Sequence, residues 1–353
     1  MRAVVFAGPG RVLVDDVPEP AIEHPMDAVV AVEKTAICGS DLHLLSGKTP
    51  GMRPGDIIGH EFVGTITELG DQVAGHREGG RVIGSFLIAC GRCPPCHSRR
   101  FNHCVNRRAL GLGPLTGDLQ GAQAQYVRIP GADVNLHPLD GVLAELSHEQ
   151  ALFAGDILTT GFYAAALSEV EPTELVAVIG AGPVGLCAAM AVRVQQRHRG
   201  RVLVLDSDPR RVAFAHERLD LEAIDVSRAD AQEAVRDRSG GTMADVAIEA
   251  VGAVDAFRTA MRCARDGGRV SVVGVYGAER YELAMGMTWI RGLDLRFSGM
   301  ANIQNHWEEA LSTVAKGGLD PTALITHRLP LADAEEAYEL FSSREAMKVV
   351  LSP

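Results

Sequence analysis

The chain has 353 residues, which is enough for two domains at roughly 150 residues each. Hydrophobic residues make up 46% and charged residues 22% of it, and this globular composition excludes a disordered or fibrous protein. With 34 Lys and Arg against 45 Asp and Glu, the formal net charge is −11. Phosphate backbones and anionic lipid would repel such a chain, so we expect neither nucleic acid nor a membrane as a partner.

Up to about residue 150, short β-branched runs alternate with Gly, Pro and Asp, which predicts an antiparallel, β-rich domain. The runs are residues 3–8, 11–17, 28–34, 62–70, 81–88 and 124–130. From about residue 157 to 296, strand-like and helix-like segments alternate, which is typical of a parallel sheet covered by helices. The tail predicts helices near 306–315 and 332–341 and a final strand at 347–351.

Two segments of the sequence indicate where in the cell the protein is expected. The N-terminus lacks a sustained apolar stretch before a cleavage site, so we expect a cytoplasmic, reducing setting. Residues 175–192 carry no charge over a length that is nominally sufficient for a membrane helix. Glycines and a proline interrupt this stretch in its middle, so it predicts a buried strand, a turn and the start of a buried helix.

That turn carries a dinucleotide-binding pattern. Gly180-Ala181-Gly182-Pro183-Val184-Gly185 follows an apolar run and opens an Ala-rich helix. Gly180 permits a tight turn, Gly182 lets the backbone approach a pyrophosphate, and Gly185 lets the helix pack against the strand. Asp206 ends the next predicted strand, where an acid can accept hydrogen bonds from ribose hydroxyls. The alternative is a glycine-rich turn with a capping Asp.

Four of the seven cysteines fall within fifteen residues, at Cys90, Cys93, Cys96 and Cys104. Four thiolates from one loop can close a tetrahedral zinc site with no open position, which is a structural site. Bacterial iron–sulfur spacing has a shorter last interval followed by proline. Unliganded or redox cysteines remain the other alternative. His97 and His103 lie in the same loop, and we interpret both as surface residues.

A second set of metal-ligand residue types is dispersed, at Cys38, His60, Glu61 and Asp156. Spacing alone does not identify a site here, because a lone cysteine beside a glycine is more often a small buried apolar residue.

Five motifs together resemble a known family. They are ICGSDLH at 37–43, GHEFVG at 59–64, the four-cysteine loop, DILTTG at 156–161 and GAGPVG at 180–185. In this order and at these intervals they resemble the zinc-dependent medium-chain alcohol dehydrogenases over essentially the full length. Asp156 with the TTG after it is similar to the formaldehyde-dehydrogenase-like and secondary-alcohol branch.

The resemblance implies an α/β fold of two domains with the active site in the cleft between them. Residues 1–156 and 297–353 would form a GroES-like β-rich catalytic domain, and residues 157–296 a Rossmann domain with a doubly wound parallel sheet. The resemblance also implies pairing through the Rossmann sheet edge into a homodimer or homotetramer. The apolar runs at 268–277 and 287–300 are the expected strands there.

Site residues follow from the same resemblance, position by position. Cys38, His60 and Asp156 match the catalytic zinc ligands, and Glu61 matches a residue that ligates transiently. Asp41 matches an acid that orients a ligand histidine, and Ser40 and His43 match a proton relay. Thr160 and Val184 match residues flanking the nicotinamide, Phe86 a wall of the substrate pocket, and Lys348 a basic residue near the cofactor phosphates. From the residues themselves, we expect Arg211 beside the ribose and Arg210 facing solvent.

The predicted function is NAD-linked interconversion of small alcohols with aldehydes or ketones, using two zinc ions per chain. A carboxylate at Asp206 favours NAD, since it would face the 2′-phosphate of NADP. The alternatives are a polyol or threonine-type dehydrogenase, a zinc-free quinone-reductase-like enzyme and a noncatalytic NAD-binding scaffold. The sequence leaves the substrate undetermined.

Overall fold

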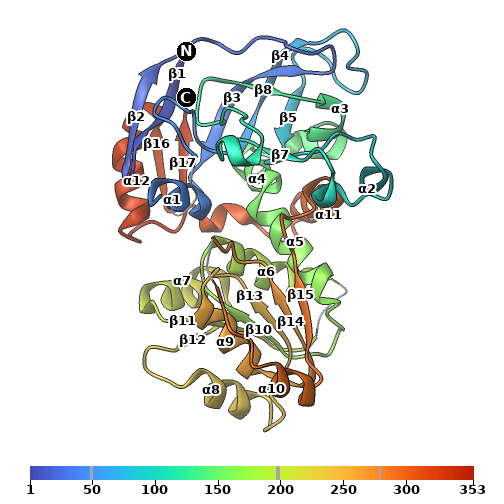
Figure 1. The fold of residues 1–353 in the computed structure, drawn as a ribbon, viewed down its shortest axis with the longest axis vertical. Helices are drawn as coiled ribbons and strands as arrows, with labels where there is room; N and C mark the ends of the chain where they lie inside the picture. Colours follow the sequence, from blue (N-terminus) through green and yellow to red (C-terminus); the bar gives the residue numbers. More distant parts are fainter. Residues whose placement is uncertain (48–50, 196–198, 278–279) are drawn as a thin grey trace. The chain divides into compact units, whose positions relative to one another are not determined.

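The computed structural model describes residues 1–47, 51–195, 199–277 and 280–353 (Figure 1). They divide into two compact units. Unit 1 comprises Met1–Thr159 and Asn302–Pro353, and unit 2 comprises Thr160–Ala301. The predicted boundaries at 157 and 297 lie three residues before Thr160 and five residues before Asn302, where the two units divide. At the first boundary the difference arises because one helix, α5 (Ile157–Ser168), runs through it.

Unit 1 is built on a seven-stranded sheet. Six of its strands follow the order β16-β17-β3-β4-β5-β9, and the seventh, β8, pairs with β3 outside this order. The pairings are antiparallel except that of β16 with β17. The strands are β3 (Ala28–Ala36), β4 (Glu61–Leu69), β5 (Arg81–Gly84), β8 (Tyr126–Ile129), β9 (Leu136–Pro138), β16 (His327–Pro330) and β17 (Val349–Ser352). Because β16 and β17 come from the C-terminal segment, the end of the chain completes the sheet of unit 1.

Smaller elements surround this sheet. They are the hairpin β1 (Arg2–Gly8) and β2 (Arg11–Asp16), the pair β6 (Leu87–Ile88) and β7 (Arg108–Ala109), and the helices α1 (Gly39–Leu45), α2 (Pro94–His97), α3 (Ala132–Asn135), α4 (His148–Leu152), α11 (Ile303–Ala315) and α12 (Ala334–Ser342). Tyr338 and Phe341 of α12 pack in one apolar cluster with Ile37 and Ile58, which lie close in sequence to Cys38 and His60. The C-terminal helix therefore shares a core with two predicted ligand segments.

Unit 2 contains a six-stranded parallel sheet in the order β12-β11-β10-β13-β14-β15. The strands are β10 (Val176–Ile179), β11 (Val202–Asp206), β12 (Glu222–Asp225), β13 (Ala244–Glu249), β14 (Ala264–Val272) and β15 (Asp294–Phe297), and the helices between them are α6 (Pro183–Val194), α7 (Pro209–Leu219), α8 (Ala231–Arg238), α9 (Val254–Cys263) and α10 (Met285–Ile290). All four residues of β10 are buried, as in a central strand covered on both faces. The strand order reverses between β10 and β13, and in such sheets ligands bind at the carboxyl ends beside this point.

Most of the predicted strands and helices are present, with differences at several segments. The run at 81–88 breaks into β5 and β6, and the polar strands β12 and β16 were not predicted. The run at 287–300 is only partly a strand, because Met287–Ile290 belongs to α10. Residues 175–192 form strand, turn and helix as predicted. Among the described residues no single helix is long and apolar enough to cross a bilayer, although the bent pair His148–Gly155 and Ile157–Ser168 passes by length and composition.

Candidate active site

Four potential metal ligands from three segments of unit 1 meet at one buried point, and we call Cys38, His60, Glu61 and Asp156 the mixed-donor cluster. Their ligand atoms all lie within 4.8 Å of one another. Asp156 Oδ2 is 3.2 Å from His60 Nε2 and 3.4 Å from Cys38 Sγ. The antiparallel register of β3 and β4 sets Ala36 opposite Glu61, which brings the first two segments to the same end of the sheet.

The charges of this cluster favour a bound cation. Burial, together with the charge of Asp156, raises the pKa of the Cys38 thiol. Burial also raises the pKa of Glu61, to about 7. At Asp156 burial opposes ionisation, but the hydrogen bond and charge of His60 outweigh it and lower the pKa of the carboxyl. A cation among these groups would favour their ionised forms and relieve their mutual repulsion.

One atom tests whether a metal fits. Glu61 Oε2 is buried and has no hydrogen-bond partner, whereas buried carboxylate oxygens normally have one. A metal ion between these side chains would supply that partner. A thiolate, an imidazole and a carboxylate form a donor set that suits zinc, and three such ligands leave one position open. The residues present therefore fit the predicted zinc ion.

The predicted neighbours of the ligands lie around the cluster. Asp41 Oδ1 is 3.3 Å from His60 Nδ1, and its Oδ2 accepts the backbone N–H of Cys38 at 2.9 Å. Ser40 Oγ lies 3.3 Å from His60 Nε2. His43 is half-buried in the last turn of α1. The Phe86 ring packs edge-on against the His60 ring, with 5.9 Å between centroids.

The second cluster is the four-cysteine lobe, defined as residues 90–104. The sulfur atoms of Cys90, Cys93, Cys96 and Cys104 lie within 4.8 Å of one another. The backbone N–H of Cys90 points to the sulfur of Cys104 at 3.3 Å. Burial raises the pKa of Cys90, but hydrogen bonds from backbone N–H groups of the loop and from the neighbouring cysteines outweigh it and bring the value to about 6. His97 and His103 are exposed, as predicted. A set of four thiols from one loop has the composition of a closed structural zinc site.

The glycine turn of unit 2 has the predicted local geometry. Gly180 has φ +107°, a conformation that residues with a side chain rarely adopt. A Cβ at Gly185 would lie 2.0 Å from the carbonyl oxygen of Gly180, so only glycine permits this packing of α6. At Gly182 the nearest atom to such a Cβ is Arg211 Nη1, at 3.6 Å, which leaves room for a ligand to approach the backbone. Pro183 and Val184 form the first turn of α6.

Asp206 stands at the end of β11 beside this turn. Its Oδ2 accepts the backbone N–H of Ala181 at 2.7 Å, and its Oδ1 accepts that of Asp208 at 2.8 Å. Arg210 is exposed and pairs with Asp208, while Arg211 faces the glycine turn. Arg210 is thus exposed, as expected, and the place of Arg211 beside the ribose stays a prediction.

Comparisons with known proteins support the same assignment. Residues 24–140 match the alcohol dehydrogenase GroES-like domain, and residues 183–316 match the zinc-binding dehydrogenase domain. An alcohol dehydrogenase of Cupriavidus necator is 31% identical, with 100% of this chain and 99% of that protein covered. The chain belongs to the zinc-dependent medium-chain alcohol dehydrogenase family. It is therefore an oxidoreductase of the zinc-binding alcohol dehydrogenase type, with a GroES-like and a Rossmann-type domain.

Two solved structures extend this finding. The alcohol dehydrogenase TADH from Thermus sp. ATN1 is 40% identical with a TM-score of 0.93, covering 100% of this chain and 99% of that one. A protein of Sinorhizobium meliloti classed as a zinc-binding dehydrogenase, solved with NADP bound, is 28% identical with a TM-score of 0.84, covering 100% and 99%. The family and these neighbours support zinc and a nicotinamide cofactor for this alcohol dehydrogenase.

One residue implied by the resemblance lies elsewhere than expected. Lys348 was predicted near the cofactor phosphates, but in this alcohol dehydrogenase it is completely buried in unit 1. Its Nζ donates to Glu61 Oε1 at 2.6 Å and to the Ile37 carbonyl at 2.8 Å. Lys348 directly precedes β17, and its side chain lies in the core of unit 1, where it neutralises a carboxylate of the mixed-donor cluster. Thr160 is buried on α5, one turn after Asp156.

Glu249, a fully buried acid at the end of β13, was not predicted from the sequence. Its Oε1 accepts the backbone N–H groups of Val251 and Gly252 at 2.7 and 2.8 Å. A Cβ at Gly180 would lie 2.6 Å from the Val251 side chain, so this carboxylate fixes a loop that borders the glycine turn. The signal in the sequence was a single acid in an otherwise apolar strand.

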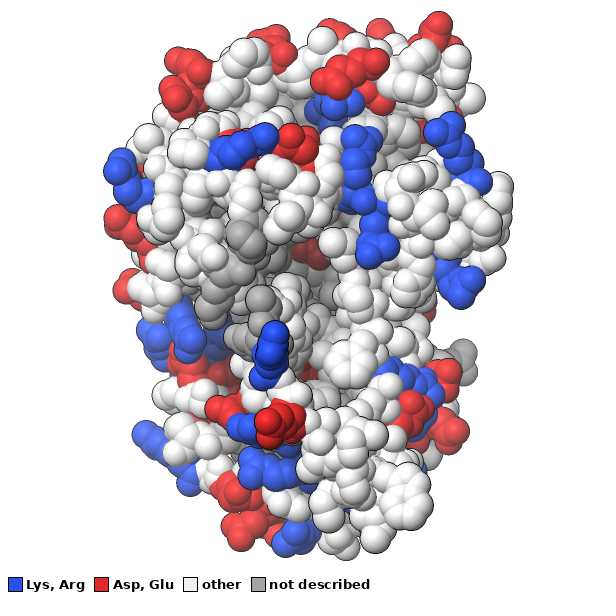
Figure 2. Space-filling view, viewed as in Figure 1, with Lys and Arg blue, Asp and Glu red and all other residues white. Residues whose placement is uncertain are grey.

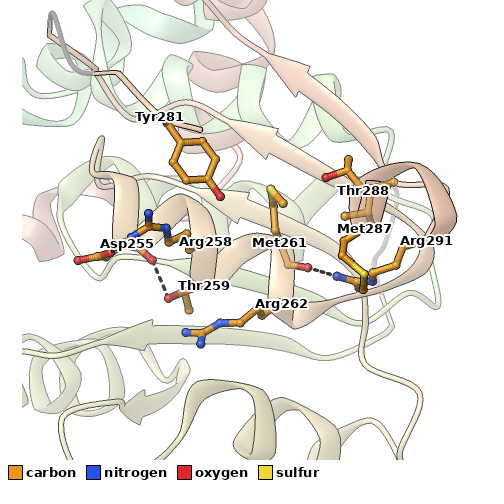
Figure 3. Close-up of a pocket in the computed structure, with 10 residues that line it drawn as sticks. Asp255, Arg258, Thr259, Met261, Arg262, Tyr281, Met287, Thr288 and Arg291 are labelled. Carbon is orange, nitrogen blue, oxygen red and sulfur yellow. Dashed lines mark hydrogen bonds and ion pairs between the residues drawn. The ribbon is translucent and has the colours of Figure 1, made fainter. Parts of the chain in front are cut away.

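A surface hollow of about 610 Å³ lies beside α9 and α10 in unit 2 (Figure 3). Two of its arginines, Arg258 and Arg291, are engaged with protein groups. Arg258 pairs with Asp255 at 3.0 Å and lies over the Tyr281 ring, and Arg291 donates to the Met261 carbonyl at 2.8 Å. None of the predicted site residues lines it, so we assign it no part in the chemistry.

Proposed function

We propose that this enzyme interconverts small primary or secondary alcohols with their aldehydes or ketones by transferring a hydride to and from NAD. The observation that carries the proposal is the buried convergence of Cys38, His60 and Asp156 beside Glu61 Oε2, which has no partner. An imidazole and two carboxyl groups beside a thiol at one buried point have no evident use in stabilising the fold, since the imidazole and the carboxyl groups are costly to bury.

The chain's own residues would divide the work at this point. Cys38, His60 and Asp156 would hold a zinc ion, which when bound acts as a Lewis acid that stabilises negative charge on a substrate oxygen. Glu61 would ligate transiently through Oε2 when substrate is absent. The Phe86 ring, packed against His60, would cover one side of the site and exclude water.

The alcohol proton needs a route to solvent, and we assign it to Ser40 and His43. Ser40 Oγ lies beside the ligand set, 3.3 Å from His60 Nε2, and a hydroxyl can accept one proton while it donates another. His43 follows three residues later on α1 and is half-buried. Imidazole is the side chain best suited to exchange protons with solvent near neutral pH.

For the cofactor we propose NAD, bound with its pyrophosphate at the glycine turn and its adenosine ribose at Asp206. The N-terminus of α6 offers backbone N–H groups, and Asp206 is held at the turn by the N–H of Ala181. Thr160 and Val184 would flank the nicotinamide. Against NAD stands Arg211 at the same turn, since an arginine there can meet a 2′-phosphate.

The Asp206→Gly variant tests this choice. We expect the unmodified enzyme to favour NAD over NADP by at least about tenfold in kcat/KM, and the variant to lose most of that preference because Arg211 remains. The measurement is kcat/KM with each cofactor. Equal efficiency in the unmodified enzyme would show that the arginine controls the site and would overturn the NAD assignment.

We further propose that the enzyme is a homodimer or homotetramer paired through the edge of the sheet in unit 2. Of the two predicted runs only β15 is an edge strand, because β14 lies between β13 and β15. Large apolar side chains are exposed on β15 and on α10, which precedes it in sequence; they are Phe297, Met285, Met287, Trp289 and Ile290. Exposed apolar groups beside an open strand edge favour pairing with a second copy. Light scattering at micromolar concentration checks this, and a monomer would refute it.

Other partners and the location follow the same physical argument. On the face that Figure 2 shows, basic and acidic side chains are interspersed, which with the net charge of −11 supports a small-molecule substrate and neither nucleic acid nor a membrane. No disulfide joins the cysteines, which supports a reducing compartment such as the cytoplasm.

A panel of alcohols tests the whole proposal. With zinc-replete enzyme and NAD, short primary and secondary alcohols should give the absorbance of NADH as the cofactor is reduced. Polyols and threonine belong in the same panel, because they separate this proposal from the related dehydrogenases. No NADH from any alcohol, with either metal-replete or freshly purified enzyme, would contradict the proposed function.

A further inference from the structure

A buried chain of polar contacts links the mixed-donor cluster to the C-terminal helix. Tyr338 of α12 donates its hydroxyl to Gln123 Oε1 at 2.9 Å. Gln123 Nε2 donates to Asp41 Oδ2 at 3.3 Å and to the Ala36 carbonyl at 3.2 Å. Asp41 Oδ1 in turn faces His60 Nδ1 at 3.3 Å. Tyr338, Gln123, Asp41 and His60 are all buried, so water does not compete for these contacts.

The partners of Gln123 fix which way its amide points. Both groups near Nε2 are acceptors, namely Asp41 Oδ2 and the Ala36 carbonyl, so a flipped amide would set oxygen against oxygen. The Tyr338 hydroxyl supplies the one donor that Oε1 needs. Burial raises the pKa of Tyr338 well above its usual value, so the hydroxyl stays protonated as a donor.

The amide in turn fixes the Asp41 carboxylate. Asp41 Oδ2 accepts N–H groups from Gln123 and from the backbone of Cys38, at 3.3 and 2.9 Å. With Oδ2 held by two donors, Oδ1 is left facing His60 Nδ1. A proton on Nδ1 leaves Nε2 as the ligand atom of His60, and Nε2 is the nitrogen that faces Asp156.

The fold makes room for this arrangement. Gly59, next to His60, has φ +88°, and a Cβ there would lie 2.3 Å from Gln123 Cγ. On the other side, Tyr338 packs in the same apolar cluster as Ile37 and Ile58. The amide is therefore held between the ligand segment and the C-terminal helix.

We infer that Gln123 and Tyr338 are positioning residues that hold Asp41, and through it His60 and Cys38, in the geometry that binds the metal. The inference rests on the proposed zinc site and adds to it a role for α12. The C-terminal segment thus contributes to the retention of the metal, in addition to completing the sheet of unit 1.

The test is the rate at which full-length, zinc-loaded enzyme releases each zinc to a chromogenic chelator. Loss of a direct outer partner of a ligand typically costs 10–100-fold in metal affinity, so Tyr338→Phe, one step further out, should speed release from the mixed-donor cluster by about three- to tenfold. Release from the four-cysteine lobe should not change, which distinguishes positioning from general destabilisation. The Cys38→Ser variant identifies which release phase belongs to which cluster. Cobalt in the mixed-donor cluster should show an altered visible spectrum.

Two further variants make the test specific. Gln123→Met removes all three hydrogen bonds of the amide in a similar volume. The double variant with Tyr338→Phe should release zinc no faster than Gln123→Met alone, because the two residues act through one chain. Tyr276→Phe is the matched control, since it removes a tyrosine hydrogen bond of 3.0 Å to the Ala253 carbonyl in unit 2.

The outcomes separate this inference from the proposed function. Unchanged release and an unchanged cobalt spectrum in Tyr338→Phe, or effects that add in the double variant, would overturn the inference and leave the zinc site standing. Unmodified enzyme that binds no zinc at the mixed-donor cluster would overturn both.

Discussion

The mixed-donor cluster and the four-cysteine lobe differ in how the chain assembles them. The lobe takes all of its ligands from residues 90–104, and backbone N–H groups of the same loop contact its sulfurs. In the cluster, Cys38 and Asp156 lie 118 positions apart in sequence. A local set of ligands can organise its own loop around a metal, whereas a dispersed set requires the sheet of unit 1 to be formed first.

The groups that surround the mixed-donor cluster also differ from those that surround the four-cysteine lobe. The cluster has a buried carboxylate oxygen without a partner, at Glu61, and an ammonium group held against that carboxylate, at Lys348. The lobe has four thiols of one kind and two exposed histidines. We therefore expect a metal in the cluster to serve chemistry and a metal in the lobe to serve stability.

The largest expected effect separates the two sites by activity. Cys38→Ser replaces a thiolate with a weaker ligand, and the loss of several kcal/mol of charge stabilisation should lower kcat/KM by more than about 10³-fold. The variant should keep one zinc per chain and a thermal midpoint close to that of the unmodified enzyme. Cys263→Ser, at a buried cysteine outside both clusters, is the matched control and should retain activity. Full activity in Cys38→Ser would end the catalytic assignment.

The reciprocal variant separates the sites by stability. Cys93→Ser opens the four-cysteine lobe, and structural zinc contributes directly to folding free energy. At 2–4 °C per kcal/mol, a loss of roughly 3–5 kcal/mol should lower the midpoint of thermal unfolding by about 10 °C. Scanning calorimetry with parallel zinc analysis checks this. A stable variant without activity would reverse the roles that we give to the two sites.

The Lys348→Met variant tests the buried ion pair between Lys348 and Glu61, which only the mixed-donor cluster has. Removing one partner of a buried ion pair typically costs about 3–5 kcal/mol, so the urea midpoint of the variant should fall accordingly. The affinity for NAD should stay unchanged, since the side chain is buried in unit 1. Lys34→Met, which removes a 2.8 Å hydrogen bond to Ser352 at a less buried position, is the control. Normal stability with weakened NAD binding would restore the role near the cofactor phosphates.

The smallest expected effect concerns proton export from the cluster. His43→Gln should slow alcohol oxidation by about two- to tenfold, less than the 10²–10⁴-fold of a base acting directly on substrate. The loss should be greatest at low pH and partly rescued by buffer bases, because an external base can replace the imidazole. Steady-state rates across pH with two buffer concentrations measure it. A pH–rate profile identical to that of the unmodified enzyme would reject the relay.

The comparison also explains what could be predicted from the sequence. The four-cysteine lobe and the glycine turn are local, so spacing alone indicated a site in each, and Gly180 and Gly185 have the conformations that the pattern requires. The mixed-donor cluster is not local, and there the spacing indicated nothing. Resemblance to a family was needed to bring Cys38, His60 and Asp156 together.

What the sequence could not predict depends on the direction of single side chains. Resemblance suggested a basic group at Lys348, but whether it faces a phosphate or a buried carboxylate depends on how β17 packs in the sheet of unit 1. Gln123 and Tyr338 lie 215 positions apart, and no pattern along the chain links them. The run at 287–300 shows that apolar character alone does not predict a strand, because Met287, Trp289 and Ile290 are apolar and yet lie exposed on α10.

Selective zinc removal tests the division between the two clusters most directly. Unmodified enzyme is treated with a chelator, and zinc content, activity and thermal midpoint are followed in the same samples. We predict near two zinc ions per chain at the start, loss of all activity with the first ion released, and a lowered midpoint only when the second leaves. Full activity in enzyme whose mixed-donor cluster has been emptied would contradict the account.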